Sequence, residues 1–417
     1  MNKRRYSAWS LFREGLRGQR GWTPAWRDRD PEPSYDVVII GGGGHGLATA
    51  YYLAKQHGID RVAVIEKGWI GGGNTGRNTT IIRSNYFHPP SAALYDLSVS
   101  LYESLSRELN YNIMFSQRGL IEIAHSDAEL ESMARAANAM RINGIPIELI
   151  DREQVLRLAP LLDGSEHARW PVHGALQQRR AGTARHDAVA WGYARAADAL
   201  GVHIIQDCEV TGFETSGGRL RAITTTRGTI RAERFGMAVA GNSSALARMA
   251  GFDLPIQSYT LQAMVSEPVK PCLDLVVLSS ANGTYVSQSD KGELVLGGNL
   301  DRCPSYAQRG GFPVTQSVIA PLLAMFPAFA NLKLMRQWGG VVDTAPDNSP
   351  IIGPSPLPGL FLNCGWGTGG FKAIPAGGTL FAHVLATGEH HPLSAAFDLV
   401  RFCSGELIDE GHAGVVH

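Results

Sequence analysis

The residues best placed to do chemistry in this sequence are three glycines and a glutamate near the N-terminus. Gly41, Gly43 and Gly46 form a Gly-x-Gly-x-x-Gly pattern, and Glu66 follows twenty residues after the last of them. In a dinucleotide-binding unit the first glycine permits a tight turn, the second lets the backbone approach a pyrophosphate, and the third lets a helix pack closely on a strand. A carboxylate at this spacing can accept hydrogen bonds from a ribose diol. The set predicts a dinucleotide cofactor.

The elements that must position these residues are those of a βαβ unit. The apolar run 37–40 predicts a buried strand directly before the glycines, and residues 47–57 predict a helix after them. A second apolar strand, 61–65, ends at Glu66. The helix N-terminus would face the phosphates with free N–H groups, and His45 would pack or hydrogen-bond near the pyrophosphate.

A second glycine-dense loop lies near the C-terminus, at residues 365–370. It follows a short apolar strand, 360–363, and precedes a helix expected over about 376–387. A second stretch of backbone could therefore approach the same ligand. Nicotinamide dehydrogenases place their binding parts mostly within one contiguous domain. A flavin nucleotide held near the N-terminus and closed over by a C-terminal loop explains both motifs.

Composition excludes several classes of protein. Lys plus Arg and Asp plus Glu both total 38, so no net field attracts nucleic acid or an anionic membrane. The five cysteines are scattered and lack CxxC spacing, which indicates neither a disulfide framework nor a metal site. No apolar run reaches the length of a membrane span. We expect a soluble, cytoplasmic protein.

The first 34 residues form a basic arm that contains three tryptophans, Trp9, Trp22 and Trp26. Its basic residues are Lys3, Arg4, Arg5, Arg13, Arg17, Arg20, Arg27 and Arg29. A targeting peptide would need an apolar segment and a small-residue cleavage site, and neither is found. Because interfaces favour Trp and Arg, we expect the arm to pack on a partner subunit.

The order of apolar runs predicts an α/β chain in which a Rossmann-like domain is interrupted by a second, α+β substrate domain. A helix over 127–143 would belong to the second domain. A helix over 188–200, a hairpin strand over 229–232 and a separate strand over 235–240 would rejoin the first βαβ unit. The expected nucleotide-binding domain comprises 35–114, 171–250 and 336–417, and the expected substrate domain comprises 115–170 and 251–335.

Seven stretches carry a family resemblance. They are YDVVIIGGGGHGLATAYYLAK from Tyr35, GGGNTGRNTTIIRSNYF from Gly71, FSQRGL from Phe115, ARHDAVAWGYARAADALGV from Ala184, CEVTGF from Cys208, WGGVVDTAPDNSPIIG from Trp338 and CGWGTGGFKA from Cys364. They resemble the glycine oxidase and sarcosine oxidase group of amine-oxidising flavoproteins, and within it the beta subunits of heterotetrameric sarcosine oxidases.

The resemblance implies a D-amino-acid-oxidase-like fold, with FAD in the Rossmann-like domain. The implied reaction is oxidative demethylation of sarcosine to glycine and formaldehyde, or to methylenetetrahydrofolate where tetrahydrofolate captures the imine. Electrons would pass to an FMN at the boundary with an alpha subunit, where oxygen becomes hydrogen peroxide, and gamma and delta subunits would complete the complex. The implied FAD-binding residues are Gly41, Gly43, Gly44, His45, Gly46, Glu66, Lys67, Asn74, Thr75, Val210, Gly241, Gly367, Gly369, Gly370 and Lys372.

Two cations are the candidate catalytic residues. An N-alkyl amino acid offers a carboxylate, and its recognition requires cations fixed close to the flavin. Arg83 follows the apolar pair Ile81 and Ile82, and Lys372 follows the C-terminal glycine loop. Both positions match carboxylate-binding residues of the single-chain relatives.

Departures from those relatives predict a subunit that passes its electrons onward. Val295 stands where they have an oxygen-activating lysine, and the segment 336–344 lacks their flavin-tethering cysteine, so FAD should be noncovalent. In the family, FMN is attached through a histidine of the beta subunit. His186 is the favoured candidate, with Arg185 near a phosphate and Asp187 as the N-cap of the following helix. His173 is the alternative.

Other functions stay open from the sequence. Arg83 and Lys372 would recognise only a carboxylate, so another secondary amine such as proline, an opine or dimethylglycine is an alternative substrate. A non-catalytic FAD-binding electron carrier would have no use for these cations. A nicotinamide-dependent dehydrogenase does not explain the C-terminal glycine loop.

Overall fold

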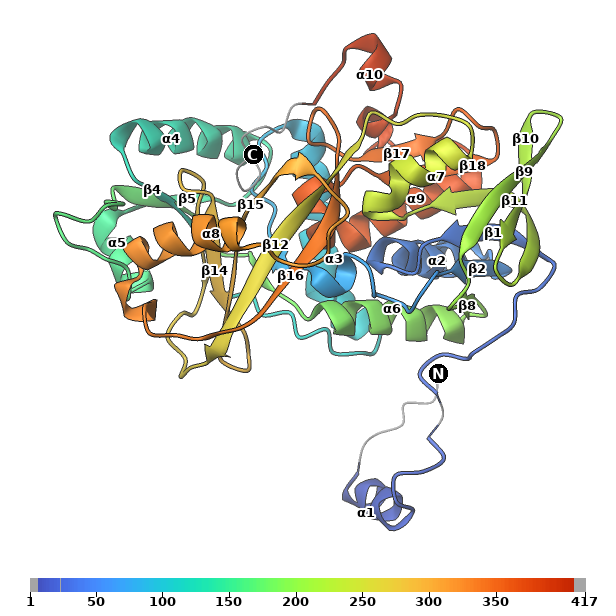
Figure 1. The fold of residues 1–417 in the computed structure, drawn as a ribbon, viewed down its shortest axis with the longest axis horizontal. Coiled ribbons are helices and arrows are strands. Elements are labelled where there is room, and N and C mark those ends of the chain that lie inside the picture. Colours follow the sequence, from blue (N-terminus) through green and yellow to red (C-terminus); the bar gives the residue numbers. More distant parts are fainter. Residues whose placement is uncertain (1–6, 23, 409–417) are drawn as a thin grey trace.

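The N-terminal βαβ unit lies at the centre of one half of the molecule (Figure 1). In the computed structural model, which describes residues 7–22 and 24–408, β1 (Ser34–Ile40) leads into α2 (Gly44–His57) and then β2 (Val62–Ile65). The first sheet has the order β17–β18–β11–β1–β2–β8, and β9 and β10 continue it from β11. Its other strands are β8 (His203–Ile205), β9 (Val210–Ser216), β10 (Arg219–Thr225), β11 (Gly228–Met237), β17 (Ile351–Pro354) and β18 (Leu360–Cys364).

Successive side chains of β1 and β2 point to opposite faces of this sheet and are buried on both of them. Val37, Ile39 and Val64 pack against one helical layer, whereas Val38 and Ile40 pack against the β9–β10 hairpin and a short helix. The helical layer consists of α2, α3 (Pro89–Glu108), α6 (His186–Ala199) and α9 (Ile374–Thr387), and the short helix on the other face is α7 (Ser243–Met249).

A second sheet forms the other half of the molecule, on the left of Figure 1, with the order β16–β12–β15–β14–β13–β4–β6–β5. Its strands are β4 (Leu120–Ala124), β5 (Glu148–Asp151), β6 (Gly174–Gln178), β12 (Gln257–Pro268), β13 (Val276–Ser279), β14 (Thr284–Gln288), β15 (Glu293–Pro304) and β16 (Leu334–Thr344). Helices α5 (Arg152–Leu158) and α8 (Phe312–Met325) cover one of its faces, and α4 (Asp127–Ile142) packs near β5 and β6. The expected fold class is confirmed.

Short elements lie between the main helices and strands. The two-stranded sheet β3 (Ile81–Ile82) and β7 (Gly182–Thr183) is one of them. The 3-10 turns are η1 (Thr75–Arg77), η2 (Ala240–Asn242), η3 (Pro327–Phe329), η4 (Gly367–Gly369), η5 (Phe371–Ala373) and η6 (Ala395–Phe397). Within residues 7–22 and 24–408, no helix combines the length and apolar character that crossing a bilayer requires.

Strand pairing corrects three sequence expectations. Residues of β6 and β16 were expected in the nucleotide-binding domain, but both strands are hydrogen-bonded within the second sheet. The strands expected separately over 229–232 and 235–240 are continuous in β11, which ends at Met237: its first residues form the expected hairpin with β10, and the rest pairs with β1. Such long-range pairing leaves no mark in the local sequence. The division into domains otherwise stays a proposal.

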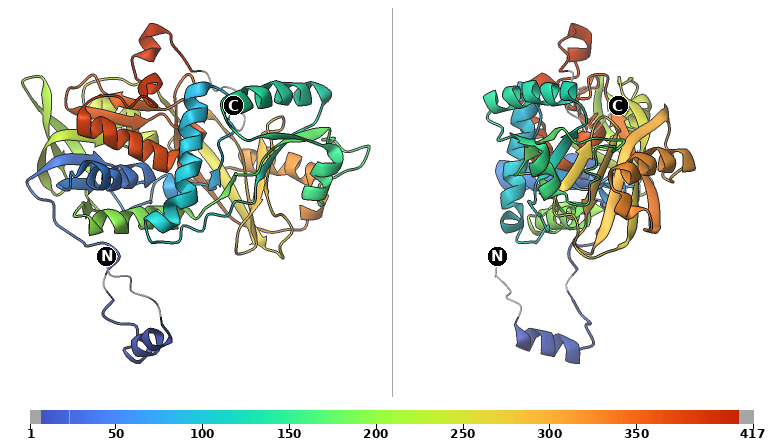
Figure 2. Two further views of the ribbon diagram at one scale, coloured as in Figure 1. Left: turned by 180° about the vertical axis from the view of Figure 1, so that it is seen from behind. Right: turned by 90° about the vertical axis from the view of Figure 1, so that its left-hand side faces the viewer.

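The N-terminal arm extends away from the body and carries α1 (Ala8–Leu16), as Figure 2 shows from two further directions. Lys3, Arg4 and Arg5 lie outside the described residues. Arg27 anchors the arm through its Nε, which is 2.9 Å from Asp198 Oδ1. The apolar side chains of α1 are all exposed, with Trp9 70% and Leu16 75% accessible. Packing of this arm on a partner subunit stays a proposal.

Candidate cofactor and substrate site

The N-terminal and C-terminal glycine loops line the same cavity, which has a volume of about 380 Å³. The sequence-predicted residues found on its wall are Gly41, Gly43, Gly44, His45, Glu66, Lys67, Asn74, Thr75, Val210, Gly367 and Gly370. They come from five separate stretches of the chain. The fold therefore assembles around this cavity the residues expected to hold a cofactor.

Three predicted cofactor residues lie next to this cavity without lining it. A Cβ added to Gly46 would lie 1.9 Å from the carbonyl oxygen of Gly41, so Gly46 serves the close packing of α2 on the turn. A Cβ on Gly241 would meet the Val341 carbonyl oxygen at 2.4 Å. A Cβ on Gly369 would meet the Tyr95 hydroxyl at 2.1 Å. These glycines allow the residues directly behind the cavity wall to pack closely together.

The turn after β1 presents backbone to the cavity. Gly41 has φ +110°, a conformation that side chains disfavour, and its added Cβ would lie 2.3 Å from the Ala238 carbonyl oxygen. Helix α2 begins at Gly44 rather than at the expected residue 47. Its N-cap, Gly43, has no side chain that could bond to the first N–H groups of the helix. The N–H of Gly44 donates to Thr75 Oγ1 at 2.9 Å. The positive end of α2 is thus directed at the cavity, as an anionic pyrophosphate requires.

Glu66 is oriented by two backbone groups of the same region. The Gly42 N–H donates to its Oε2 at 2.8 Å, and the Gly68 N–H donates to its Oε1 at 2.9 Å. A carboxylate has about four acceptor positions, so further acceptor capacity remains on each oxygen. Glu66 can therefore accept ribose hydroxyls without giving up the contacts that hold it.

His45 joins the two glycine loops. Its Nε2 donates to the Gly370 carbonyl oxygen at 2.9 Å, and its ring stacks on Trp366 with a centroid separation of 4.6 Å. Burial lowers the pKa of His45 to about 4, although the Gly370 contact opposes the shift. The imidazole is therefore neutral at pH 7 and acts as a fixed hydrogen-bond donor between the loops.

Sequence reasoning missed Asp343, which also lines the cavity. Its Oδ2 accepts the Gly365 N–H at 2.6 Å, so β16 holds the start of the C-terminal glycine loop. Burial raises the pKa of the Asp343 carboxyl to about 7, and the Gly365 N–H opposes this effect. No local pattern distinguishes Asp343 from other aspartates. The stretch from Trp338 that contains Asp343 indicates the family resemblance and the missing cysteine, but not a role for this side chain.

Arg83 and Lys372 line a second cavity of about 40 Å³. Both are buried, with 3% and 6% of their surfaces accessible. Arg83 Nη1 donates to Asn85 Oδ1 at 2.6 Å, and Lys372 Nζ donates to the Thr368 carbonyl oxygen at 3.1 Å. Burial, reinforced by the positive charge of Arg83, holds the pKa of Lys372 well below its usual value. The guanidinium of Arg83 and the amine of Lys372 thus share a small space, with the Glu122 carboxyl also interacting with Arg83, and a bound anion would favour the charged form of Lys372.

The second cavity adjoins the first. Asn78 and Phe371 belong to the walls of both. A small anion held by Arg83 and Lys372 would therefore lie beside whatever occupies the larger cavity. Molecules bound in the two cavities would be held close enough together to react with each other.

The candidate FMN histidines lie outside both cavities. His186 is the first residue of α6, whose N-cap is Arg185, so the expected N-cap role of Asp187 is wrong. The Asp187 carboxylate instead accepts from Arg185 and from the Ala188 N–H at 2.8 Å. His173 Nδ1 lies 2.8 Å from Asp127 Oδ1. Val295 is in β15, opposite Ser287 of β14 and Val265 of β12.

The donor set fits an extended dinucleotide. The larger cavity combines a helix N-terminus, a preoriented carboxylate and two glycine loops, and the neighbouring pocket is cationic. Among the described residues, no cluster of His, Cys, Asp and Glu could hold a metal ion. Fold and site together define a dinucleotide-binding α/β protein with a separate small-molecule pocket beside the cofactor.

Comparison with known proteins gives the family. The sequence model of the FAD dependent oxidoreductase family matches residues 36–384. The sarcosine oxidase subunit beta of Rhodobacter capsulatus is 52% identical over 99% of this chain and 100% of its own length, and that of Rhizobium meliloti is 54% identical over 98% of each. The crystal structure of L-proline dehydrogenase from P. horikoshii matches with a TM-score of 0.85 at 28% identity, covering 90% of this chain and 100% of its own. The chain belongs to the FAD dependent oxidoreductase family, and within it to the sarcosine oxidase beta subunits.

Proposed function

We propose that this chain oxidises sarcosine by removing a hydride equivalent from its methyl group, as the catalytic subunit of a larger complex. The observation that carries the proposal is the placement of Arg83 and Lys372 in a cavity that shares Asn78 and Phe371 with the cofactor cavity. FAD, when bound, supplies the acceptor for the hydride. Hydrolysis of the resulting imine by water gives glycine and formaldehyde, and capture by tetrahydrofolate gives methylenetetrahydrofolate instead.

The chain's own cations would bind and orient the substrate carboxylate. Hydrogen bonds to charged groups contribute roughly 1.5–3 kcal/mol each. A bound carboxylate would also relieve the repulsion between Arg83 and Lys372 and favour the ammonium form of Lys372, which burial otherwise disfavours. Substrate binding and the charge state of Lys372 would thus be coupled.

Removing either cation should weaken the reduction of FAD by sarcosine. The quantity to compare is the limiting rate of FAD reduction divided by the sarcosine concentration that gives half of that rate. Arg83→Met and Lys372→Met should each reduce this ratio of limiting rate to half-saturation roughly tenfold to a hundredfold, because each removes one charge-assisted hydrogen bond. Anaerobic stopped-flow mixing of the complex with sarcosine, followed by flavin absorbance, measures this ratio. The exposed Lys291 provides the matched control, since Lys291→Met should leave the ratio unchanged. Wild-type ratios in both cavity variants would exclude this carboxylate site.

The chain would hold FAD noncovalently and carry a second flavin, FMN, on His186. The larger complex would contain alpha, gamma and delta subunits, with FMN at the alpha boundary and hydrogen peroxide formed there. Two observations support His186 over His173. The helical backbone fixes the position of His186, and burial lowers its pKa, so a neutral ring nitrogen is available for bonding. His173 is instead paired with Asp127.

Acid precipitation and peptide mapping test both flavin assignments together. Acid should release FAD into the supernatant, whereas the mass of FMN should stay on the peptide that contains His186. An FMN adduct on the His173 peptide would reverse the histidine assignment. FAD retained by the precipitated protein would contradict the noncovalent proposal, and no adduct on either peptide would remove the covalent FMN.

A second candidate substrate is L-proline. The similarity to the structure of L-proline dehydrogenase favours it over the other secondary amines considered, an opine and dimethylglycine. All of these carry a carboxylate for Arg83 and Lys372 and differ in the group on nitrogen. Comparing FAD reduction by sarcosine and by L-proline at equal concentrations decides between the two. A carrier without substrate would be reduced by neither.

A further inference from the structure

The wall of the Arg83–Lys372 cavity includes side chains from three strands of the second sheet, of which β13 and β14 are neighbours and β12 is separated from β14 by β15. Leu261 comes from β12, Leu278 from β13 and Tyr285 from β14. Ile81 of β3 and Phe371 of the C-terminal loop also lie on this wall. The cavity therefore combines two cations with a largely apolar surface built by a different part of the chain.

Leu278 and Tyr285 form a cross-strand pair on the cavity face of the sheet. They belong to a small apolar cluster that also contains Ile81 and Val276. Side chains one position away point to the other face, where Val277, Val286 and Leu296 pack in the core under α8. The strand alternation thus separates residues that can touch a substrate from residues that only support the sheet.

Tyr285 is held rigidly in this wall. It lies directly opposite Gly297 of β15, and a Cβ added to Gly297 would be 2.1 Å from its hydroxyl oxygen and 2.3 Å from Cζ. Its hydroxyl accepts a hydrogen bond from Thr79 Oγ1 at 3.0 Å, and Thr79 also lines the cavity. Burial raises the pKa of Tyr285 to about 12, so the ring stays uncharged at neutral pH. Only glycine at position 297 leaves room for the tyrosine in this position.

Little space is left once the wall and the cations are in place. The cavity measures about 40 Å³. On the same measure a single water molecule needs roughly 10–15 Å³, so the cavity suits a small molecule and offers little room beyond it. Packed protein interiors do not expand freely, so a larger substituent would have to displace side chains.

We propose that the Leu278–Tyr285 pair, held in place by Gly297, restricts the substituent on the substrate nitrogen to about the size of a methyl group. This inference rests on the proposed function, because it assumes that Arg83 and Lys372 hold the carboxylate. Leu278 and Tyr285 are then the residues that determine specificity, and Gly297 is a positioning residue that acts through Tyr285. The methyl group on the nitrogen of sarcosine fits beside this wall. The larger nitrogen substituents of N-ethylglycine and L-proline would collide with it.

Shortening Leu278 should shift the substrate preference. In Leu278→Ala, the ratio of limiting rate to half-saturation for N-ethylglycine relative to sarcosine should rise about tenfold or more, because one methylene group in an apolar pocket is worth roughly 10- to 200-fold in discrimination. The reductions are followed anaerobically in the complex. Leu296→Ala is the matched control, because it removes the same atoms from the opposite face of the sheet and should leave the ratio unchanged. Leu278→Val, a smaller change, should move the ratio in the same direction and serves if the alanine variant does not fold.

Gly297→Ala tests the positioning role. The added methyl group must displace Tyr285, so half-saturation for sarcosine should rise, and Gly297→Ala/Tyr285→Leu should restore it because the clashing ring atoms are gone. If wild-type FAD is not reduced by sarcosine, the proposed function fails. If sarcosine reduces it but the ratio is unchanged in both Leu278→Ala and Leu278→Val, the proposed function stands and this inference is wrong. Half-saturation unchanged in Gly297→Ala would exclude the role of Gly297.

Discussion

Replacing Gly43 with Val should give a folded protein that retains much less FAD. Gly43 lines the larger cavity and caps α2, and an added Cβ would meet only Thr75 Oγ1, at 3.3 Å. The fold can therefore accept the side chain, but its two methyl groups would occupy the space where a pyrophosphate approaches the backbone. Overpacking costs typically about 1–3 kcal/mol, and a cost of this size in the complex with FAD corresponds to roughly a 5- to 140-fold loss in FAD affinity.

The measurement is the ratio of flavin absorbance to protein absorbance after gel filtration, with circular dichroism as the check on folding. Gly212→Val is the matched control: Gly212 lies in β9 and lines neither cavity, and an added Cβ would be 3.6 Å from Thr224. It should retain FAD, because a β-branched side chain suits a strand. Gly46→Ala should differ from both, since its clash with Gly41 at 1.9 Å would disturb the fold itself. Full FAD content in Gly43→Val would show that the cofactor does not approach this turn.

The parts of the site that the sequence predicts are those with a local physical signal. The glycine spacing, the apolar strand before it and the acid after it each reflect a conformational or packing need within one βαβ unit. The start of α2 was misplaced by three residues, because Gly44 and Gly46 lower the apparent helix propensity although the helix includes both. The prediction that Arg83 and Lys372 bind one carboxylate together depends on the family resemblance.

The parts that could not be predicted depend on contacts between distant strands. β16 was placed with the C-terminal glycine loop because the two are neighbours in sequence, yet it pairs with β12 in the second sheet and brings Asp343 to the cofactor cavity. Leu278 and Tyr285 look like any other residues of apolar strands. Their relation to Arg83 exists only after β13 and β14 pair and β3 closes against them, so no local pattern identifies the specificity wall.

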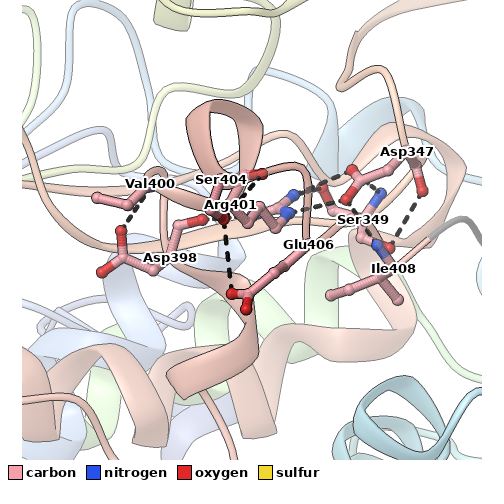
Figure 3. Close-up of polar contacts among 8 residues, drawn as sticks. All are labelled: Asp347, Ser349, Asp398, Val400, Arg401, Ser404, Glu406 and Ile408. Atoms are coloured by element: carbon pink, nitrogen blue, oxygen red, sulfur yellow. Dashed lines mark hydrogen bonds and ion pairs between the residues drawn. The ribbon is translucent and has the colours of Figure 1, made fainter.

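A buried ion pair near the C-terminus holds the segment that precedes β17 (Figure 3). Arg401, the first residue of α10 (Arg401–Ser404), donates from Nε to Asp347 Oδ2 at 2.7 Å and from Nη2 to Asp347 Oδ1 at 3.0 Å. The same guanidinium donates to the carbonyl oxygens of Ser349 and Asp398. The Ile408 N–H donates to Asp347 Oδ2 at 3.2 Å. These contacts join residues 398–408, which follow the part matched by the family model, to the loop between β16 and β17.

Arg401→Met should lower the free energy of unfolding by about 3–5 kcal/mol. The Asp347 side chain is 0% exposed, so loss of the guanidinium would leave a buried carboxylate without its counter-ion. Urea unfolding of the purified complex, followed by circular dichroism, measures the change. The exposed pair Arg248–Asp253, with 69% and 84% of the side chains accessible, supplies the control, and Arg248→Met should cost less than about 1 kcal/mol.

A double substitution separates the charge from the packing. Asp347→Leu/Arg401→Met removes both ions, and replacement of a buried pair by apolar side chains is often neutral, so much of the lost stability should return. If the double variant instead loses as much free energy of unfolding as Arg401→Met does, the stabilisation comes from the hydrogen bonds with Ser349, Asp398 and Ile408. A change below about 1 kcal/mol in Arg401→Met itself would contradict the buried ion pair, because a carboxylate that tolerates the loss of its partner must have access to water.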